Sequence, residues 1–545
     1  MTTWRVTRRG VRVVGSLLGW GLLVFARPAD AATYTMAPGD SWSAKLAQLQ
    51  PGDTLLLQDG TYGPVTIDCD ANASDGTAAA PITLRAEHER QAFIAGDGNR
   101  DATLSLVRCD YWIIEGLHVE AGDADNQSVL GYALRLAGSS NNILRRNLLA
   151  RNNRYLNSHL LGLEYDSNSN LVEENEFYMF HRHAVLAYNT IRNTIRRNYS
   201  NSRGYPDLPG GYPSGESGRG DSGIAIYPGS NNILENNISE NTSDGFTVDS
   251  AYWESHETNN NGFFGNMALN CTDGWYADAR NNTLKGMPQN TVLRDNVAVR
   301  AGIGFRLAAT KNTRCSNCSA IGGGYGFYAN VEAPELTGDG APSVYFENAL
   351  AVSNANDGFL ITQQSDWLIN YGNASDNGTN YSPNDAHVTN SASLDPRLGA
   401  CKVWIPDGSP MKGAGKDGAD IGANILYRYE NGVLTTQPLW DLVSGKFPCG
   451  AIVPGLNDIA GSSCFDVHQR LNVNTNGCSF PQGYGAAPLR GDLTGDGKRD
   501  LADVRLLIYM LIGQQATTPE AELTGDGAVT LADLQALIKL MVGVP

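Results

Sequence analysis

The sequence predicts an all-β fold, a right-handed parallel β-helix, followed by a small all-α calcium-binding domain. Two repeats lead to this prediction. Between residues 141 and 380 a short phrase ending on asparagine recurs nine times, and near the C-terminus a longer unit occurs twice, thirty residues apart. Repeats of these two kinds indicate a solenoid and a duplicated helical module.

The asparagine phrase keeps its apolar and β-branched residues while its spacing varies from 21 to 39 residues. A helical repeat would fix the length of its turns, whereas a β-helix absorbs length changes in outward loops. We expect the asparagines to stack in a buried turn, each amide bonding the next coil's amide and backbone. The predicted ladder residues are Asn147, Asn175, Asn198, Asn237, Asn266, Asn296, Asn317, Asn348 and Asn373.

A second mark follows later asparagines as SDGFTVD, TDGWYAD, GIGFRLA, GYGFYAN and NDGFLIT. We expect the glycine to let the chain turn and the aromatic residue to enter the core. Alternation along a strand then places every second residue outside. This predicts an outward column of Thr247, Tyr276, Arg306 and Tyr328 beside a second column of Asp249, Asp278, Ala308 and Asn330.

The N-terminal 31 residues have the form of a secretory signal peptide. Arg5, Arg8, Arg9 and Arg12 precede the apolar run VVGSLLGWGLLVF, which ends before the small residues around Ala31. The run is too short to span a bilayer. We therefore predict a secreted protein with a signal peptide at 1–31, a β-helix at 32–398, a closing segment and linker at 399–489, and the C-terminal module at 490–545.

The chain is strongly acidic. Its formal net charge is −17, and removal of residues 1–31 takes away five arginines and Asp30, giving −17 − 5 + 1 = −21. Such a charge disfavours nucleic acid and anionic membranes as partners and suits a secreted protein that binds calcium. An anionic substrate would need local cations.

Nine cysteines fit an oxidising compartment, with one left unpaired. Proximity in the chain predicts the pairs Cys464–Cys478 and Cys401–Cys449. The CSNC sequence at 315–318 spans a predicted ladder asparagine, so we expect core packing there rather than a metal or redox site.

Two columns of polar residues follow the predicted coils. Near one corner lie His159, His183, Asp221, Asp244 and Asp273, and near the other end of the same strand lie Glu164, Tyr188, Tyr227, Asp249 and Asp278. A solvated polar face is the ordinary interpretation. However, adjacent coils lie about 4.8 Å apart, so stacked aspartates bring like charges almost into contact. A bound cation or a raised pKa would relieve this, and we predict a functional acidic cluster.

Two insertions flank this cluster. Residues 201–223 form a Gly/Pro/Ser-rich excursion that we expect to wall a substrate groove, and residues 280–289 carry Lys285 on the same side. The predicted substrate contacts are His159, His183, Tyr188, Tyr227 and Tyr328.

The C-terminal repeat begins each time with a twelve-residue calcium loop and continues into an apolar stripe typical of a helix. The predicted ligands are Asp492, Thr494, Asp496, the Lys498 carbonyl, Asp500 and Asp503, then Glu522, Thr524, Asp526, the Ala528 carbonyl, Thr530 and Asp533. This duplicated unit without an entering helix resembles a type I dockerin, although threonine stands third in both loops and Glu522 stands first in the second. The resemblance implies a cohesin partner, read through Leu501, Ala502, Leu531 and Ala532. A calcium-stabilised appendage without a partner is the alternative.

The marks SDGF, TDGW and GIGFRLA, on three successive coils, resemble family nine polysaccharide lyases, such as pectate lyases, which have the pectin-lyase-like β-helix. The resemblance implies calcium held by Asp244 and Asp273, with help from Asp249 or Asp278, and it places Arg306 where that family has its lysine base. Thr272 and Tyr276 stand where further aspartates would be expected. The implied substrate is a uronate-containing polysaccharide.

β-Elimination on a uronate needs a cation to neutralise the carboxylate and a base near the C5 proton. Arginine stays charged, so Tyr276, Lys285 or Lys311 would supply the base if Arg306 binds the carboxylate. The runner-up is a β-helix glycoside hydrolase that uses two carboxylates. A non-catalytic carbohydrate-binding protein is the third possibility.

Overall fold

The computed structural model of this 545-residue chain describes most of its length. The described residues are 31–122, 128–151, 158–202, 220–250, 257–279, 287–330, 342–362, 364, 366–441, 444–447, 450–457, 465–478, 480, 491, 493, 499, 501–512, 521, 523–524 and 529–541. The signal-peptide prediction and the body of both insertions lie outside them.

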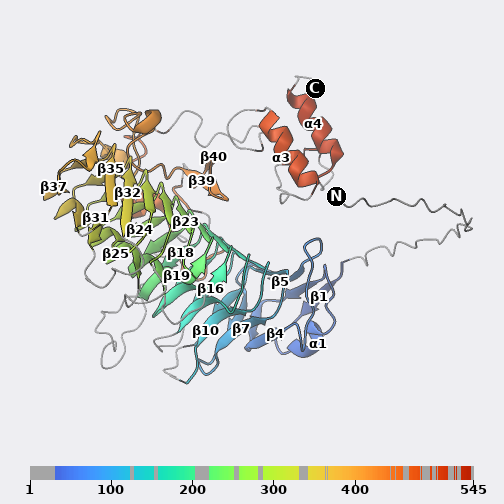
Figure 1. Ribbon diagram of the computed structural model, residues 1–545. Helices are drawn as coiled ribbons and strands as arrows, with labels where there is room; N and C mark the ends of the chain where they lie inside the picture. Colours follow the sequence, from blue (N-terminus) through green and yellow to red (C-terminus); the bar gives the residue numbers. More distant parts are fainter. Residues whose placement is uncertain are drawn as a thin grey trace, which may run out of the picture.

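The predicted parallel β-helix is confirmed: within the described residues, three long parallel sheets run along one solenoid (Figure 1). Sheet A has fourteen strands: β1 (Thr33–Met36), β2 (Thr54–Leu57), β5 (Ile82–Ala86), β8 (Trp112–Glu115), β11 (Ile143–Arg145), β14 (Leu171–Glu173), β17 (Thr194–Arg196), β20 (Ile233–Glu235), β23 (Gly262–Phe264), β26 (Val292–Arg294), β29 (Thr313–Ser316), β32 (Ser343–Glu347), β35 (Asp366–Asn370) and β38 (Val388–Thr389).

The other two sheets have twelve described strands each. Sheet B contains β3 (Gly60–Tyr62), β6 (Ala92–Ala95), β9 (His118–Glu120), β12 (Leu148–Ala150), β15 (Glu176–Tyr178), β18 (Tyr199–Asn201), β21 (Ile238–Glu240), β24 (Met267–Leu269), β27 (Val297–Val299), β30 (Ser319–Ile321), β33 (Leu350–Val352) and β36 (Asn373–Ser375). Sheet C contains β4 (Val65–Asp68), β7 (Ala102–Val107), β10 (Tyr132–Ala137), β13 (His159–Glu164), β16 (His183–Ile191), β19 (Gly220–Ser230), β22 (Thr242–Ser250), β25 (Asp273–Ala279), β28 (Ile303–Leu307), β31 (Tyr325–Asn330), β34 (Asp357–Thr362) and β37 (Thr379–Ser382).

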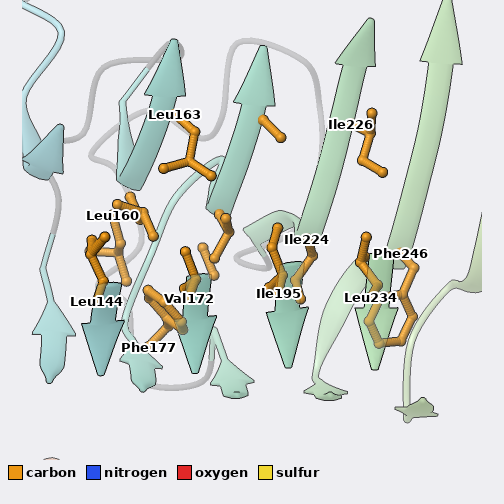
Figure 2. Close-up of a cluster of buried hydrophobic side chains, with 14 of the residues drawn as sticks. Leu144, Leu160, Leu163, Val172, Phe177, Ile195, Ile224, Ile226, Leu234 and Phe246 are labelled. Carbon is orange, nitrogen blue, oxygen red and sulfur yellow. The ribbon is translucent and has the colours of Figure 1, made fainter. Parts of the chain in front are cut away.

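Each coil contributes one strand to each sheet, so residues one coil apart lie side by side in the core. Figure 2 shows this packing for Leu144, Val172, Ile195 and Leu234 on successive strands of sheet A. The predicted core aromatics stack along sheet C, with ring centroids 4.5–5.0 Å apart from one ring to the next through Phe246, Trp275, Phe305, Phe327 and Phe359. At the N-terminal end the short helix α1 (Trp42–Leu46) packs Leu46 against the same core.

Six of the nine predicted ladder asparagines form the ladder. From Asn147 to Asn296, each side-chain amide donates to the next residue's Oδ1 at 2.9–3.1 Å. Asn317, Asn348 and Asn373 lie outside this ladder, although the Asn348 amide donates to Asn317 Oδ1 at 3.5 Å. Arg294 pairs with Ser316, so Cys318 occupies the next ladder position and Asn317 is displaced by one residue.

A second ladder lies at the other end of the same short strands and was not predicted. Asn142, Asn170, Asn193, Asn232 and Asn261 bond in the same way, at 3.1–3.3 Å. Its signal is present in the sequence, since each of these residues precedes a ladder asparagine by five positions. Two buried amide stacks therefore hold both ends of the sheet A strands.

The glycines of the Gly-aromatic mark have a role other than the predicted one. They lie within strands and do not have positive φ angles, so they do not make turns. A Cβ on Gly245 would lie 2.7 Å from the Cβ of Ala268, and one on Gly274 would lie 3.0 Å from the Cβ of Ala298. These glycines therefore allow sheets B and C to approach closely at the corner.

Residues after the solenoid fold back over the outside of sheet B. Tyr178, Tyr199 and Leu269 of that sheet form one apolar cluster with Trp404 and Phe465. This segment contains η1 (Gly399–Cys401), η2 (Lys416–Gly418), β39 (Tyr427–Glu430), β40 (Val433–Pro438) and α2 (Val467–Leu471). Part of the predicted linker is thus packed against the solenoid. We call residues 399–480 the covering segment.

The disulfides differ from the predicted pairs. Cys401 bonds Cys478, because the covering segment brings these two residues together, and Cys69 bonds Cys109. Cys449 and Cys464 lie outside the described residues. The two cysteines of CSNC are packed in the core as expected, and they also bond each other. The free cysteine among the described residues is Cys271, which is buried.

The two predicted C-terminal helices are present as α3 (Leu501–Leu511) and α4 (Leu531–Met541). They pack together through Leu507 and Leu537, which are buried. The predicted apolar stripe is only partly buried, since Leu501 and Leu531 are 76% and 68% exposed. Among the described residues, no helix is long and apolar enough to span a membrane.

Candidate active site

The outer face of sheet C carries the predicted acidic cluster. Gly245 faces the core, so Asp244 before it faces outward, and Thr247 after it faces outward as well. The same corner geometry on the next strand turns Asp273 outward beside Gly274. Asp244 pairs with Asp273 in register, as predicted. On the strand before, the corner position belongs to Ser222 and not to Asp221.

Asp244 and Asp273 occupy this corner, Asp221 adjoins it, and arginines lie beside Asp221 and Asp273. Asp221 Oδ2 lies 3.7 Å from Arg182 Nε, and Asp273 Oδ2 lies 3.2 Å from Arg306 Nε. Asp244 lies on the strand between these two aspartates. It accepts a hydrogen bond from the Thr247 hydroxyl at 3.2 Å. Asp244 is therefore the carboxylate where a proton or a cation would be most favourable.

The pKa values reflect this arrangement. Burial, with the charges of Asp221 and Asp273, raises the pKa of Asp244 well above its usual range. Burial also raises the pKa of Asp273 to about 6, although Arg306 opposes the shift. Both carboxyls therefore hold a proton more readily than an exposed aspartate does.

The buried hydroxyls of Ser222 and Thr247 form a chain of hydrogen bonds that ends on Asp244. Ser222 Oγ lies 2.8 Å from Thr247 Oγ1, which in turn donates to Asp244. Both hydroxyl-bearing residues are fully buried. Because Thr247 uses its proton on the carboxylate, Ser222 must donate to Thr247, and the chain of hydroxyls is oriented toward Asp244.

Arg306 lies between two tyrosines on the middle outward column. Its guanidinium carbon is 5.8 Å from the ring centre of Tyr276 and 5.7 Å from that of Tyr328, on the strands before and after. The Arg306 side chain is 31% exposed. The predicted column is confirmed, and it presents a cation, held by two rings and Asp273, to the solvent.

The predicted histidines lie upstream and are buried. The rings of His159 and His183 stack at 4.8 Å with an angle of 3°, and His183 meets Tyr227 edge-on at 5.3 Å. Burial lowers the pKa of His159 well below its usual range, with Arg182 adding to the effect. The two stacked rings are buried packing partners here, and a contact with substrate stays a prediction.

The remaining predicted residues lie farther along the strands or outside the description. Asp249 pairs in register with Asp278 and is buried, whereas the side chain of Asp278 is not described. The Glu164 carboxylate accepts hydrogen bonds from the Tyr132 hydroxyl at 2.8 Å and from Arg135 Nε at 2.7 Å.

Of the three proposed bases, Tyr276 lies beside Arg306. Lys311 lies in the turn after β28, where its backbone amide donates to Pro288. Lys285 lies outside the described residues.

A calcium ion fits the chemistry of the corner only in part. Asp244 and Asp273 offer adjacent carboxylates, and the buried Asp273 Oδ1 has no hydrogen-bond partner among the described residues. Within the described part of the chain, however, no three His, Cys, Asp or Glu side chains are grouped to hold a metal. Calcium takes six to eight oxygen ligands, so water or substrate would have to supply the others.

In the C-terminal module, the two aspartates at the twelfth loop positions occupy equivalent environments. Asp503 Oδ1 accepts from the Leu493 amide at 2.7 Å, and Asp533 Oδ1 accepts from the Leu523 amide at 2.6 Å. Asp533 also caps α4 by accepting from the Thr530 amide. The predicted ligands Asp492, Thr494, Asp496, Lys498, Asp500, Glu522, Asp526 and Ala528 lie outside the described residues.

Sequence reasoning missed Ser222, Arg182 and Tyr325 at this site. Tyr325 precedes the glycine of the mark GYGF, where Asp244 precedes that of SDGF. The repeated mark therefore predicts that Tyr325 lies in the same column as Asp244. Arg182 had no such signal, because it acts through Asp221 on a neighbouring strand.

Comparison with known proteins gives a partial family match. Residues 39–294, just under half of the chain, match the model of the chondroitinase B family. That stretch includes Asp244 and Asp273 and ends before Arg306. No curated protein matches the sequence.

Solved structures that are similar share low identity with this chain. A pectate lyase has 17% identity over 72% of this chain and 96% of its own, with a TM-score of 0.39. A PL6 family alginate lyase has 14% identity over 67% of this chain and 53% of its own, with a TM-score of 0.41. A GH87 α-1,3-glucanase from Streptomyces thermodiastaticus has 12% identity over 68% of each chain, with a TM-score of 0.44. The parallel sheets described above make the chain a parallel β-helix, and residues 39–294 are similar to the chondroitinase B family.

Proposed function

We propose that the protein is a secreted polysaccharide lyase that cleaves a uronate-containing polysaccharide by β-elimination. The observation that carries the proposal is the half-exposed Arg306 between Tyr276 and Tyr328, next to the carboxylates of Asp244 and Asp273. The similarity of residues 39–294 to the chondroitinase B family supports the same reaction class.

In the proposed reaction, Arg306 binds the uronate carboxylate and withdraws charge from C5. Its planar fork suits bidentate contact with a carboxylate. Tyr276, whose ring lies against the guanidinium, takes the C5 proton in its phenolate form. The C–H electron pair forms the C4–C5 double bond, the C4–O4 bond breaks, and the leaving oxygen takes a proton.

Calcium is the proposed cofactor at this corner. Asp244 and Asp273 would hold it, with the Thr247 hydroxyl fixing Asp244. A divalent cation supplies charge neutralisation for the substrate carboxylate. Bound there, the cation would also relieve the repulsion between the two aspartates. Arg306 would then no longer be required to neutralise Asp273.

A glycoside hydrolase is the second candidate, and one observation favours it. Asp244 and Asp273 lie side by side, and the pKa of Asp244 is raised well above its usual range while that of Asp273 is raised to about 6. Such a pair can act as general acid and base on a glycosidic bond. In that case Arg306 would orient Asp273 and would not bind substrate.

A product assay separates these functions. The full-length protein is incubated with pectate, alginate and dermatan sulfate, with calcium or with chelator. A lyase releases unsaturated uronates that absorb in the ultraviolet, and this activity should be lost in chelator. New reducing ends without that absorbance would indicate the hydrolase, and binding without either product would indicate a carbohydrate-binding protein.

For the C-terminal module, we propose a calcium-loaded dockerin that attaches the enzyme to a cohesin. The exposure of Leu501 and Leu531 at equivalent positions of α3 and α4 supports two similar docking faces. A pull-down with a type I cohesin tests this attachment, and failure to bind in calcium would favour a stabilising appendage.

A further inference from the structure

The outer face of sheet C changes character at the acidic cluster. On the middle outward column, Leu186, Ala225 and Thr247 are buried, whereas Tyr276 and the next three positions are half-exposed. Those next positions are Arg306, Tyr328 and Leu360. Among the described residues, this column is open to a polymer from β25 toward the C-terminal coils.

The accessible stretch is lined with tyrosines that support one another. Tyr328 lies one coil beyond Arg306, and its ring meets that of Tyr325 edge-on at 5.7 Å and 71°. Tyr325 occupies the same corner column as Asp244 and Asp273, two coils farther along than Asp273. The rings are thus held by each other and by the Arg306 cation before any ligand arrives.

Half-buried tyrosines at fixed angles suit the apolar face of a pyranose ring. The C–H groups of the sugar meet the electron-rich face of the aromatic ring, while the hydroxyl groups stay in contact with water. Because these rings are already fixed, little side-chain entropy is lost on binding.

We propose that Tyr325 and Tyr328 form a sugar-stacking subsite for the unit next to the uronate held by Arg306, so that the bound polysaccharide extends toward the C-terminal coils. The proposal rests on the proposed function for the uronate at Arg306. It adds the direction of the chain and a second contact, neither of which the lyase reaction requires.

The structure offers a matched control on another face. Tyr345 on sheet A is also half-buried and lies under an arginine, with Arg314 4.7 Å from its ring centre. Its hydroxyl donates to Asp366 at 2.5 Å. Tyr345→Ala therefore removes a tyrosine with the same kind of partner outside the proposed subsite.

Binding is measured by calorimetry on the full-length protein with hexasaccharides of pectate, alginate and dermatan sulfate. For any hexasaccharide that binds the wild type, Tyr328→Ala and Tyr325→Ala should each raise Kd about tenfold, which is about 1.4 kcal/mol. Tyr328→Phe should keep the wild-type Kd, and Tyr345→Ala should leave it unchanged. Unchanged melting temperatures show that the variants are folded.

The outcomes separate the inference from the proposed function. If Tyr328→Ala and Tyr325→Ala bind as tightly as the wild type, the subsite is wrong even when unsaturated products form. If the affinity is lost as expected while no unsaturated product appears, the subsite stands and the lyase assignment fails. Equal losses for Tyr345→Ala and Tyr328→Ala, or no binding of any hexasaccharide by the wild type, would overturn the subsite.

Discussion

Asparagine and aspartate, stacked at the same coil spacing, have opposite consequences in this solenoid. Asn237 both donates and accepts: its amide nitrogen donates to Asn266 Oδ1 and to the Ile195 carbonyl, and its Oδ1 accepts from the Asn198 amide. Asp244 and Asp273 only accept when ionised. Burial raises the pKa of both carboxyls, and the charges of Asp221 and Asp273 add to the shift of Asp244. The amide stack stabilises the fold by itself, whereas the carboxylate pair needs a proton, an arginine or a metal ion.

Replacing a ladder asparagine should destabilise the solenoid. Asn237→Ala leaves buried donors and acceptors on both neighbouring coils without partners, at a cost of about 1–3 kcal/mol. Asn259→Ala is the control, because this half-buried amide donates to Glu257 outside the ladder. Thermal unfolding of both variants should show a lower midpoint for Asn237→Ala alone, and equal midpoints would contradict the ladder's role.

Replacing Arg306 should remove activity without unfolding the protein. Arg306→Ala is expected to lower kcat/KM for uronate elimination about 10²- to 10³-fold, the typical cost of losing one electrostatic contact to the reacting group. Arg306→Lys should retain part of the activity, because it keeps the charge and loses the planar fork. Arg314→Ala, on sheet A, should have wild-type kinetics. A hydrolase in which Arg306 only orients Asp273 would show no ultraviolet product in any of them.

The sequence predicted residues whose roles repeat from coil to coil. The ladder up to Asn296 and the outward column through Arg306 follow from spacing alone. Asn317 was assigned to the ladder wrongly. It follows the last residue of its sheet A strand directly, whereas Asn296 follows its own strand after one intervening residue. Arg182 was missed because its contact with Asp221 comes from an adjacent strand and leaves no periodic trace.

At the scale of elements, the covering segment has an irregular sequence and packs over the outer face of sheet B. Its buried aromatic residues do not recur with the period of a strand or a helix, so its composition predicted a linker. Phe465, within this predicted linker, packs against Tyr199 with the two ring centroids 5.7 Å apart. Its hairpin, β39 with β40, also buries Tyr429 against the Asp295 carboxyl of the solenoid. This contact links two parts of the chain that are distant in sequence.

The Asp295 contact should make stability depend on pH. Burial raises the pKa of Asp295 to about 6, from 3.8 when exposed. Because the folded state holds the proton more tightly, the stability it contributes is complete below about pH 4 and is lost as the pH rises through about 6. The loss amounts to about 3 kcal/mol at 1.36 kcal/mol per unit.

The comparison with Asp295→Asn isolates this effect. The variant has no proton to lose, so its stability relative to the wild type should rise between pH 4 and pH 7 and then level off. Denaturant unfolding at several pH values gives this difference. A difference that stays constant over the range would show that Asp295 does not ionise within the folded protein in this window.

At the scale of the whole molecule, the last prediction concerns calcium and the C-terminal module. The two twelve-residue segments contain four and three carboxylates, and carboxylates held in so short a loop would repel one another without a cation. The small cluster around Leu507 and Leu537 is a limited core for two helices. Metal binding should therefore supply much of the folding free energy of α3 and α4.

The test compares the full chain with a chain ended at residue 489, each in calcium and in chelator. Because the remainder of the described protein is nearly all β, the helical circular dichroism of the full chain should fall in chelator to that of the shortened one. Asp533→Asn should weaken the response of the second loop, where the same carboxylate also caps α4 through Thr530. Helical signal that persists undiminished in chelator would mean that packing alone folds the module, and the calcium-loop interpretation would fail.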